Sequence, residues 1–378
     1  MTSEWPKREL TALDAWLLES PFEPLDVAAD ATHPLGDAPL SPFVSLKRAG
    51  AAGVVCAGGL GDGAFGSVLK LVDAHGQTAA AKLCAYDGWR APRTAADRAA
   101  NERKRAAAIF GLFKEASPLR PPAHLPPALQ ADVLAELNER GARHVPRFLG
   151  FRLLNGLEPA ILMERLGKDL RVIERPGFVK LSNRSLVDAL DSMVVALAEI
   201  HALGWMTADV KADNFCVVPG RRAVKLVDFG MMRRVEWPAV VPFAEFKALG
   251  VQRGGAVGTR PYIARATYFR TPMSPVDNIE SLFYVALRLA GENFPWLEAG
   301  KWQAFDRKCT YWKDVHGFCL PFFHDWFTAI ERTPRDSRLA YEQLIDDLRD
   351  SLAAFARDIE PDSDPFPQVV YHPGFCSY

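Results

Sequence analysis

The clearest hydrophobic pattern in the chain is helical and runs from Val187 to Leu203. Apolar residues recur there three or four positions apart, the spacing of one helix face, at Val187, Leu190, Val194, Leu197 and Ile200. Acidic residues interrupt the same stretch, so we expect a helix in a protein core and not a membrane span. His201 closes this helix, and we expect it to be a packed or capping side chain.

Shorter apolar runs in the first half of the chain are typical of strands. Residues 147–154 and 158–170 predict two strands that lead into a connection between lobes. Two helical stretches precede them, at 97–116 and at about 128–139. A further helical region, 277–352, is rich in aromatic residues that we expect in its core, namely Trp296, Trp302, Trp312, Phe322, Phe323 and Trp326.

The length of the chain indicates two lobes. A single core stops growing near about 250 to 300 residues, and this chain has 378. We expect an N-terminal extension over 1–50, a strand-rich lobe over 51–165, a helical lobe over 166–358 and a tail over 359–378. For the extension, whose short amphipathic start is followed by prolines, we expect a docking segment or a disordered lead, with a regulatory arm as the alternative.

Composition narrows the class of protein. Hydrophobic residues make up 49% of the chain and charged residues 24%, with a formal net charge of −1, which gives no electrostatic reason to expect nucleic acid or a membrane as partner. The six cysteines are scattered without a C-x-x-C pair, so we expect neither a disulfide framework nor a zinc site. No secretory signal or long apolar span is evident, and we expect a soluble intracellular protein of the cytoplasm or nucleus.

Two carboxylates follow the core helix at a spacing that suits phosphoryl transfer. Asp209 opens an Asp-x-Lys-x-x-Asn run containing Lys211 and Asn214, and Asp228 opens an Asp-Phe-Gly. One carboxylate must accept or orient the proton of an attacking hydroxyl, while a second carboxylate and an amide oxygen hold the Mg²⁺ that bridges the β- and γ-phosphates. The lysine can place a positive charge on the transferring phosphate. The pattern therefore predicts phosphoryl transfer from a metal nucleotide.

A glycine-rich stretch lies upstream. Gly61, Gly63, Gly66 and Val68 form G-x-G-x-x-G-x-V between apolar runs, and glycines let backbone N–H groups approach phosphate oxygens. Three spaced glycines alone are a weak signal. Lys82, on the following apolar run, stands where a lysine could hold the α- and β-phosphates, and it makes a nucleotide site the better interpretation.

With these motifs assembled, the chain resembles a eukaryotic-type protein kinase, and more narrowly the casein kinase I superfamily. The narrower likeness rests on GTRPYIA, SPVDNIESLFYVALRL and FPW, at residues 258–264, 274–289 and 294–296. Within that superfamily, the vaccinia-related kinases are most similar. That likeness rests on MERLGKDL, DVKADN and LVDFG, at residues 163–170, 209–214 and 226–230.

The resemblance implies an α+β, bilobal kinase-like fold and ATP-dependent transfer to Ser or Thr of protein substrates, with Mg²⁺ or Mn²⁺. By motif position, Lys82 grips phosphates, Asp209 is the base, Lys211 assists at the γ-phosphate, and Asn214 with Asp228 holds the metal. Backbone groups of Glu164 and Leu166 would meet the adenine. The full set of implied nucleotide-site residues is Gly61, Gly63, Phe65, Gly66, Val68, Ala80, Lys82, Glu102, Met163, Glu164, Leu166, Asn214 and Asp228.

The lysine of a kinase needs an acidic partner on a helix, and several residues compete for this role. Glu102 is favoured, because Ala106 and Ile109 share its helix face and would point to the lobe interior. Its rivals are Glu115, Asp132 and Glu136, and for any of them a surface charge pair is the plainer interpretation.

Three departures from the kinase pattern bear on activity. Thr207 and Ala208 replace the His-Arg that most kinases place before the catalytic Asp, so we expect activity that does not depend on phosphorylation of the activation loop. Ala212 stands where many kinases carry Pro. Asn278 replaces an Asp that braces the catalytic loop, and without a charge we expect a weaker brace.

Three functions compete on these residues. An active Ser/Thr protein kinase, acting as a monomer, is favoured because all four central side chains are present. A pseudokinase that binds nucleotide or partners is the second, and a small-molecule kinase of the aminoglycoside or choline type is the third, disfavoured by Lys211 and the long loop after Asp228. That loop has an excess of basic residues, which could hold acidic or phosphorylated peptide or could simply be solvated.

Overall fold

The computed structural model describes residues 28–29, 55–63, 66–72, 78–83, 125, 127–154, 158–171, 181–235, 237, 257–269, 272–292, 294–314 and 320–359. They divide into two compact units. The first contains the described residues up to Asn138 together with Pro146–Arg165, and the second contains Glu139–Val145 together with those from Leu166 onward. The short piece 139–145, which we expected in the first lobe, groups with the second because the Leu226 N–H donates to the His144 carbonyl at 2.8 Å.

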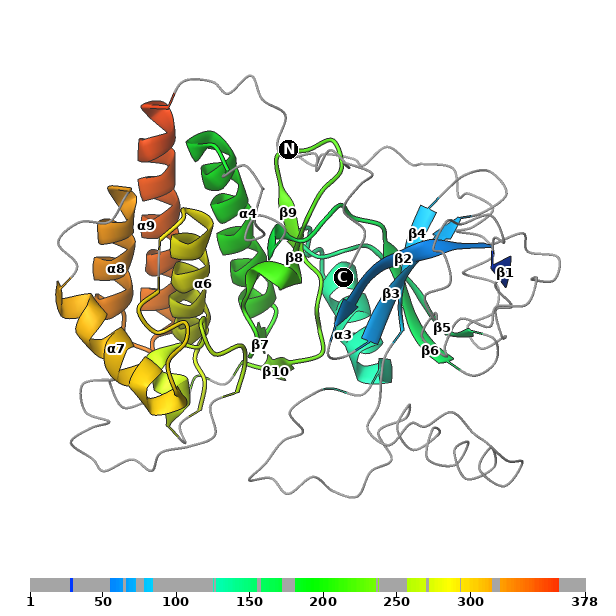
Figure 1. Ribbon diagram of the computed structural model, residues 1–378, viewed down its shortest axis with the longest axis horizontal. Helices are drawn as coiled ribbons and strands as arrows, with labels where there is room; N and C mark the ends of the chain where they lie inside the picture. The colour runs from blue at the N-terminus through cyan, green and yellow to red at the C-terminus, as the bar shows by residue number, and fades with distance from the viewer. Residues whose placement is uncertain are drawn as a thin grey trace. The chain divides into compact units, whose positions relative to one another are not determined.

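The first unit is built on a sheet of six described strands (Figure 1). In spatial order they are β1 (Ala28–Ala29), β2 (Val55–Gly63), β3 (Gly66–Val72), β4 (Thr78–Leu83), β6 (Glu158–Glu164) and β5 (Phe148–Leu154). β1 pairs in parallel with β2, and all other pairs are antiparallel. The predicted strands at 147–154 and 158–170 are thus confirmed, although the second ends at Glu164.

Helix α3 (Pro127–Glu139) lies between β4 and β5 in the chain and confirms the helix predicted at about 128–139. Its buried face is formed by Val133, Leu134 and Leu137, which are at most 2% exposed. Asn138 ties the end of the helix to the sheet: its amide donates to the Pro146 carbonyl at 3.0 Å and its Oδ1 accepts from the Phe148 N–H at 2.8 Å. These bonds fix the point at which the helix ends and β5 begins.

The second unit is mainly helical (Figure 1). Its described helices are α4 (Asn183–Ala202), α6 (Pro275–Leu289), α7 (Lys301–Asp314), α8 (Phe322–Arg332) and α9 (Arg338–Arg357), with short 3₁₀ turns η2 (Ala212–Asn214) and η3 (Arg265–Tyr268). This unit also contains two small antiparallel strand pairs. In one, β8 (Phe215–Val217) pairs with β9 (Val224–Leu226), and in the other, β7 (Trp205–Thr207) pairs with β10 (Met232–Arg234). A strand-rich unit followed by a helical one confirms the predicted α+β class.

Helix α4 carries the apolar face that the sequence predicts. All five residues of that face are buried, the Ser182 hydroxyl caps the helix by accepting from the Ser185 N–H at 3.1 Å, and α6 and α9 pack against it.

Of the aromatic residues expected in the core, Trp296, Phe322, Phe323 and Trp326 are at most 2% exposed. Trp302 is half-buried, and the side chain of Trp312 lies outside the described part. No described helix combines the length and apolar character that crossing a membrane requires.

Candidate catalytic and nucleotide-binding residues

Asp209, the predicted base, lies in a loop between β7 and η2 and is 4% exposed. Each of its carboxylate oxygens has its own partners. Oδ1 accepts from both the N–H and the hydroxyl of Thr259, at 2.9 and 2.6 Å, and Oδ2 lies 2.6 Å from Lys211 Nζ. The structure therefore brings the predicted base and the predicted γ-phosphate lysine together and fixes the rotation of the carboxylate.

Asn214 and Asp228, the predicted metal ligands, are brought to the same end of the β8–β9 hairpin. β8 begins one residue after Asn214, β9 ends two residues before Asp228, and the Val227 N–H donates to the Asn214 carbonyl at 2.9 Å. The Asn214 amide nitrogen donates to the Asp209 carbonyl at 2.8 Å, which directs its Oδ1 elsewhere. Asp228 Oδ1 accepts from the Gly230 N–H at 2.9 Å.

The donor set at this end suits a hard cation. Mg²⁺ in nucleotide sites takes one or two protein oxygens and completes its shell with phosphate oxygens and water. Asn214 and Asp228 offer one amide oxygen and one carboxylate. Across the described ranges, no group of three or more His, Cys, Asp or Glu side chains is placed to hold a metal without such help.

Asn278 braces the catalytic loop from α6. Its Nδ2 donates to the Thr207 carbonyl at 2.8 Å, and its Oδ1 accepts from the Thr207 N–H at 3.2 Å. The same Oδ1 lies 2.9 Å from His201 Nε2. We expected an uncharged residue here to give a weaker brace, but the amide donates and accepts at once, which a carboxylate cannot do.

His201 is a packed residue, as the sequence predicts. Because Asn278 Oδ1 can only accept, Nε2 carries the proton, and Nδ1 accepts from the Tyr341 hydroxyl at 2.5 Å. Burial lowers the pKa of His201 to about 4, and the bond to Asn278 opposes this only in part. The imidazole is therefore neutral at physiological pH and serves as a rigid link between α9 and the catalytic loop.

In the first unit, sheet register places several predicted nucleotide-site residues on one face. Val68 is paired with Lys82, and Ala80 is paired with Met163. Directly paired residues of antiparallel strands point to the same side, and so do residues two positions apart, such as Ala80 and Lys82. Gly61 is paired with Val68 across the glycine-rich hairpin, in which Gly63 also pairs with Gly66. The predicted face is thus assembled, but Phe65 at the hairpin tip lies outside the described residues.

Lys82 is buried, and an amide on α3 lies beside its ammonium group. Lys82 Nζ lies 3.3 Å from Oε1 of Gln130 on α3, and the two side chains are 8% and 1% exposed. Glu102 and Glu115 lie outside the described residues, Asp132 is exposed, and Glu136 is half-buried. Our search for a partner considered only acidic residues and therefore missed Gln130. The signal was nonetheless available, because Gln130 shares one helix face with Val133, Leu134 and Leu137.

The predicted hinge residues are split between the two units. Met163 and Glu164 end β6 in the first unit, whereas Leu166 belongs to the second. The Glu164 N–H donates to the Arg147 carbonyl at 2.8 Å, and its carboxylate accepts from the Arg147 N–H at 3.0 Å. If Glu164 meets adenine through its backbone, the group it presents is the carbonyl.

The segment 258–264 touches the catalytic loop through Gly258 as well as Thr259. Gly258 has a φ of +109°, and a Cβ built on it would lie 2.4 Å from the Ala208 carbonyl oxygen. Only glycine allows this close approach without strain. The glycine therefore positions Thr259 against Asp209.

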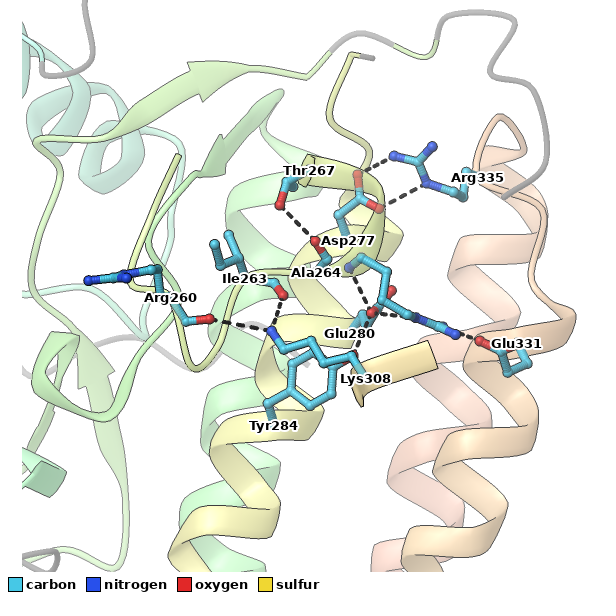
Figure 2. Close-up of polar contacts among 11 residues, drawn as sticks. Arg260, Ile263, Ala264, Thr267, Asp277, Glu280, Tyr284, Lys308, Glu331 and Arg335 are labelled. Atoms are coloured by element: carbon cyan, nitrogen blue, oxygen red, sulfur yellow. Dashed lines mark hydrogen bonds and ion pairs between the residues drawn. The ribbon is translucent and has the colours of Figure 1, made fainter. Parts of the chain in front are cut away.

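Further along, three carbonyls of the same segment are held by buried side chains, and Figure 2 shows the two that are held by Lys308. Lys308 of α7 donates to the carbonyls of Ile263 and Arg260, at 2.5 and 3.4 Å, and Trp296 Nε1 donates to the Pro261 carbonyl at 3.0 Å. Lys308 is 0% exposed and lies 4.3 Å from the Tyr284 ring centroid. Burial lowers the pKa of Lys308 to about 7, against the opposing charge of Glu280. We did not single out this lysine from the sequence.

Two buried ion pairs anchor α6 beside this segment (Figure 2). Glu280 Oε1 accepts from the backbone N–H and Nε of Arg265, each at 2.9 Å, and from the Tyr284 hydroxyl at 2.7 Å. Burial raises the pKa of Glu280, but the Arg265 charge and these bonds outweigh it and the pKa is lowered. At the start of α6, Asp277 pairs with Arg335 Nε at 2.8 Å and accepts from the Ser274 N–H at 2.8 Å.

Comparisons with known proteins agree with this architecture. No family model matches the chain. The serine/threonine-protein kinase spe-6 of Caenorhabditis elegans is 28% identical over 175 residues, which is 45% of this chain and 44% of that protein. The match therefore spans less than half the length of this curated relative.

Among solved structures, that of vaccinia-related kinase 3 matches with a TM-score of 0.55 and 18% identity, over 80% of this chain and 87% of that one. At this identity the match establishes the fold alone. The two comparisons confirm the resemblance to protein kinases of the casein kinase I and vaccinia-related kinase branch, and the chain has the fold of a protein kinase.

Proposed function

We propose that this protein is an ATP- and Mg²⁺-dependent protein kinase that transfers the γ-phosphoryl group to Ser or Thr hydroxyls. The observation that carries the proposal is the arrangement around Asp209, whose two oxygens are held by Thr259 and Lys211 beside the Asn214 amide. A fixed carboxylate next to a fixed positive charge is what an attacking alcohol and a transferring phosphate require.

In the proposed reaction, the substrate hydroxyl oxygen forms a bond to the γ-phosphorus while the bond to the β-phosphate oxygen breaks. Asp209 orients the hydroxyl and takes its proton, and Lys211 stabilises the negative charge of the transferring group. Asn214 and Asp228 would hold Mg²⁺, which neutralises charge on the β- and γ-phosphates when bound. In the first unit, Lys82 and the glycine-rich hairpin would bind the phosphates.

We further propose that activity does not depend on phosphorylation of the activation loop. Ala208 stands where a kinase that uses loop phosphorylation carries an Arg before its catalytic Asp, and Asp209 is already oriented by Thr259. Treatment with a phosphatase should therefore leave transfer to an added substrate unchanged. A large loss of transfer after that treatment would contradict this part of the proposal.

The direct test is incubation of purified protein with labelled ATP, Mg²⁺ and a panel of acidic and basic proteins, followed by phosphoamino acid analysis. Label on Ser or Thr of an added protein supports the proposal, and we propose that acidic substrates are preferred because the loop after Asp228 is basic. Label on small alcohols alone would contradict it.

A pseudokinase that binds nucleotide is the second candidate. It is favoured by Thr207 and Ala208, which stand before Asp209 in place of the usual His-Arg. The hydrogen bonds of Asn278 to Thr207 weigh against it, because the catalytic loop is braced. Nucleotide binding without transfer to any protein in the panel would favour this candidate.

A further inference from the structure

Lys308 of α7 carries an ammonium group that the protein encloses (Figure 2). The residue is 0% exposed, and its Nζ lies 4.3 Å from the ring centroid of Tyr284 and 5.6 Å from those of Tyr268 and Trp296. Taking an ammonium group out of water is costly, and an apolar side chain of similar length would fill the space among these rings without that cost. The charge and the donors of Lys308 therefore indicate a role beyond packing.

The donors of Lys308 meet one turn of the chain. The Tyr262 N–H donates to the Thr259 carbonyl at 2.9 Å, which closes a turn over 259–262. Lys308 Nζ contacts the Arg260 carbonyl inside this turn at 3.4 Å and the Ile263 carbonyl just after it at 2.5 Å. An ammonium group has three donors and can serve both carbonyls at once. Lys308 therefore ties the turn to α7.

Two neutral donors hold neighbouring carbonyls. Trp296 Nε1 donates to the Pro261 carbonyl at 3.0 Å, and the Thr267 hydroxyl donates to the Ala264 carbonyl at 2.7 Å. The bonds from Lys308 are charge-assisted, and bonds of that kind are the stronger ones. Removing Lys308 should therefore loosen the turn more than removing either neutral donor.

Thr259 joins this turn to the predicted base. Its carbonyl closes the turn, while its N–H and its hydroxyl both donate to Asp209 Oδ1. The turn thus begins at the residue that orients the carboxylate, so a shift of the turn moves both donors. Hydrogen bonds weaken steeply with misalignment, and a small shift is enough to release the carboxylate.

Resting on the proposed kinase function, we propose that Lys308 is a positioning residue for phosphoryl transfer, which acts on Asp209 through the turn over 259–262 and through Thr259. It is a positioning residue and not a catalytic one, because its donors are directed to the turn. Helix α7 then sets the direction of the Asp209 carboxylate. A change at Lys308 should alter the rate of transfer without altering nucleotide binding.

The test uses the full chain and a protein substrate that takes up label in the panel assay. Lys308→Met keeps a long side chain among the rings and removes the charge and the donors. We expect kcat to fall about 10-fold, as for loss of a hydrogen bond to a charged group, with ATP affinity measured by calorimetry unchanged. Gln303→Met, at an exposed position of the same helix, is the matched control and should leave kcat unchanged.

A double-mutant cycle with Thr259→Val separates positioning from general damage to the fold. If Lys308 acts through Thr259, the double variant should lose less than the roughly 100-fold product of two 10-fold losses. Losses that multiply would overturn the proposal, because the two residues would then act independently, and so would an unchanged kcat in Lys308→Met. Should Lys308→Met fail to fold, Lys308→Gln keeps one donor group for the turn and carries the same cycle, with a smaller loss of kcat expected.

Hydrogen exchange of the amides of 258–264 tests the same link without turnover. The Thr259 and Tyr262 amides should exchange faster in Lys308→Met than in the wild type, whereas Gln303→Met should not change them. Equal exchange in Lys308→Met and the wild type would overturn the proposal. Failure of the proposed function is a separate result: if the wild type transfers no label, faster exchange in Lys308→Met would still show that Lys308 holds Thr259, and only the kinase activity would be withdrawn.

Discussion

The Thr259 hydroxyl donates to Asp209 Oδ1 at 2.6 Å, although the two residues are fifty positions apart in the sequence. The Thr259 N–H donates to the same oxygen at 2.9 Å. The segment 258–264 is thus bonded directly to the predicted base. Ordering of this segment and orientation of the base are therefore coupled through one residue.

Thr259→Val should lower the rate of phosphoryl transfer about 10-fold, because it removes one hydrogen bond to a carboxylate while it keeps the shape of the side chain. The backbone N–H bond to Asp209 remains, so the loss should be partial. Thr259→Ser keeps the hydroxyl and should retain most of the rate. Steady-state kinetics with ATP and a protein substrate would measure both variants, and equal rates for Val and wild type would contradict the coupling.

Gly258→Ala should destabilise the second unit by at least about 1 kcal/mol, since φ is +109° and the new Cβ would meet the Ala208 carbonyl oxygen. Gly300→Ala is the control, because nothing lies within 4 Å of its Cβ position. Urea unfolding of both variants would measure their unfolding midpoints, and we expect a lower midpoint for Gly258→Ala than for Gly300→Ala. Equal midpoints would mean that the segment relaxes away from the catalytic loop at little cost.

Glu280→Gln should cost about 3–5 kcal/mol of unfolding free energy, because it leaves the buried charge of Arg265 without its buried partner. Glu342→Gln removes an exposed partner of Arg338 and should cost less than about 1 kcal/mol. Thermal and denaturant unfolding would compare the two. A similar small loss for both variants would show that Glu331 or water replaces Glu280.

Stability should fall with pH below 6.5 because of His201. The pKa of His201 is 6.5 in the reference state and about 4 in the fold, so the unfolded chain takes up a proton first as pH falls. The loss begins as pH falls through 6.5 and is complete below 4, and it amounts to roughly 3 kcal/mol. His201→Gln should flatten the dependence of unfolding free energy on pH in this window. An unchanged slope in His201→Gln would contradict the assignment.

Much of the arrangement of the candidate site could be predicted from local sequence. Asp209, Lys211 and Asn214 lie within six positions, and Asp228 follows across one hairpin, so short-range spacing nearly determines their arrangement. The sequence also predicts Val68 on one strand, with Ala80 and Lys82 on the next, and the structure has them on β3 and β4. Side chains alternate between the two faces of a strand, so the pairing register decides that these three share a face.

The residues that we missed are those whose contacts join parts of the chain far apart in sequence. Gln130 lies beside Lys82, which is 48 positions earlier in the sequence. Lys308 likewise serves carbonyls of residues 45 and more positions away. At Asn278, which we did single out, residue type alone suggested a missing charge, whereas the structure shows an amide that both donates to and accepts from the Thr207 backbone.

The central claim is that Asp209 readies a protein hydroxyl for attack on a bound nucleotide. The measurement that tests it most directly compares the wild type with Asp209→Asn for transfer of label from ATP to a protein substrate, together with ATP affinity. We predict that transfer falls strongly, by a factor of about 100 or more, while ATP affinity stays nearly unchanged. Equal turnover by the two proteins would contradict the account.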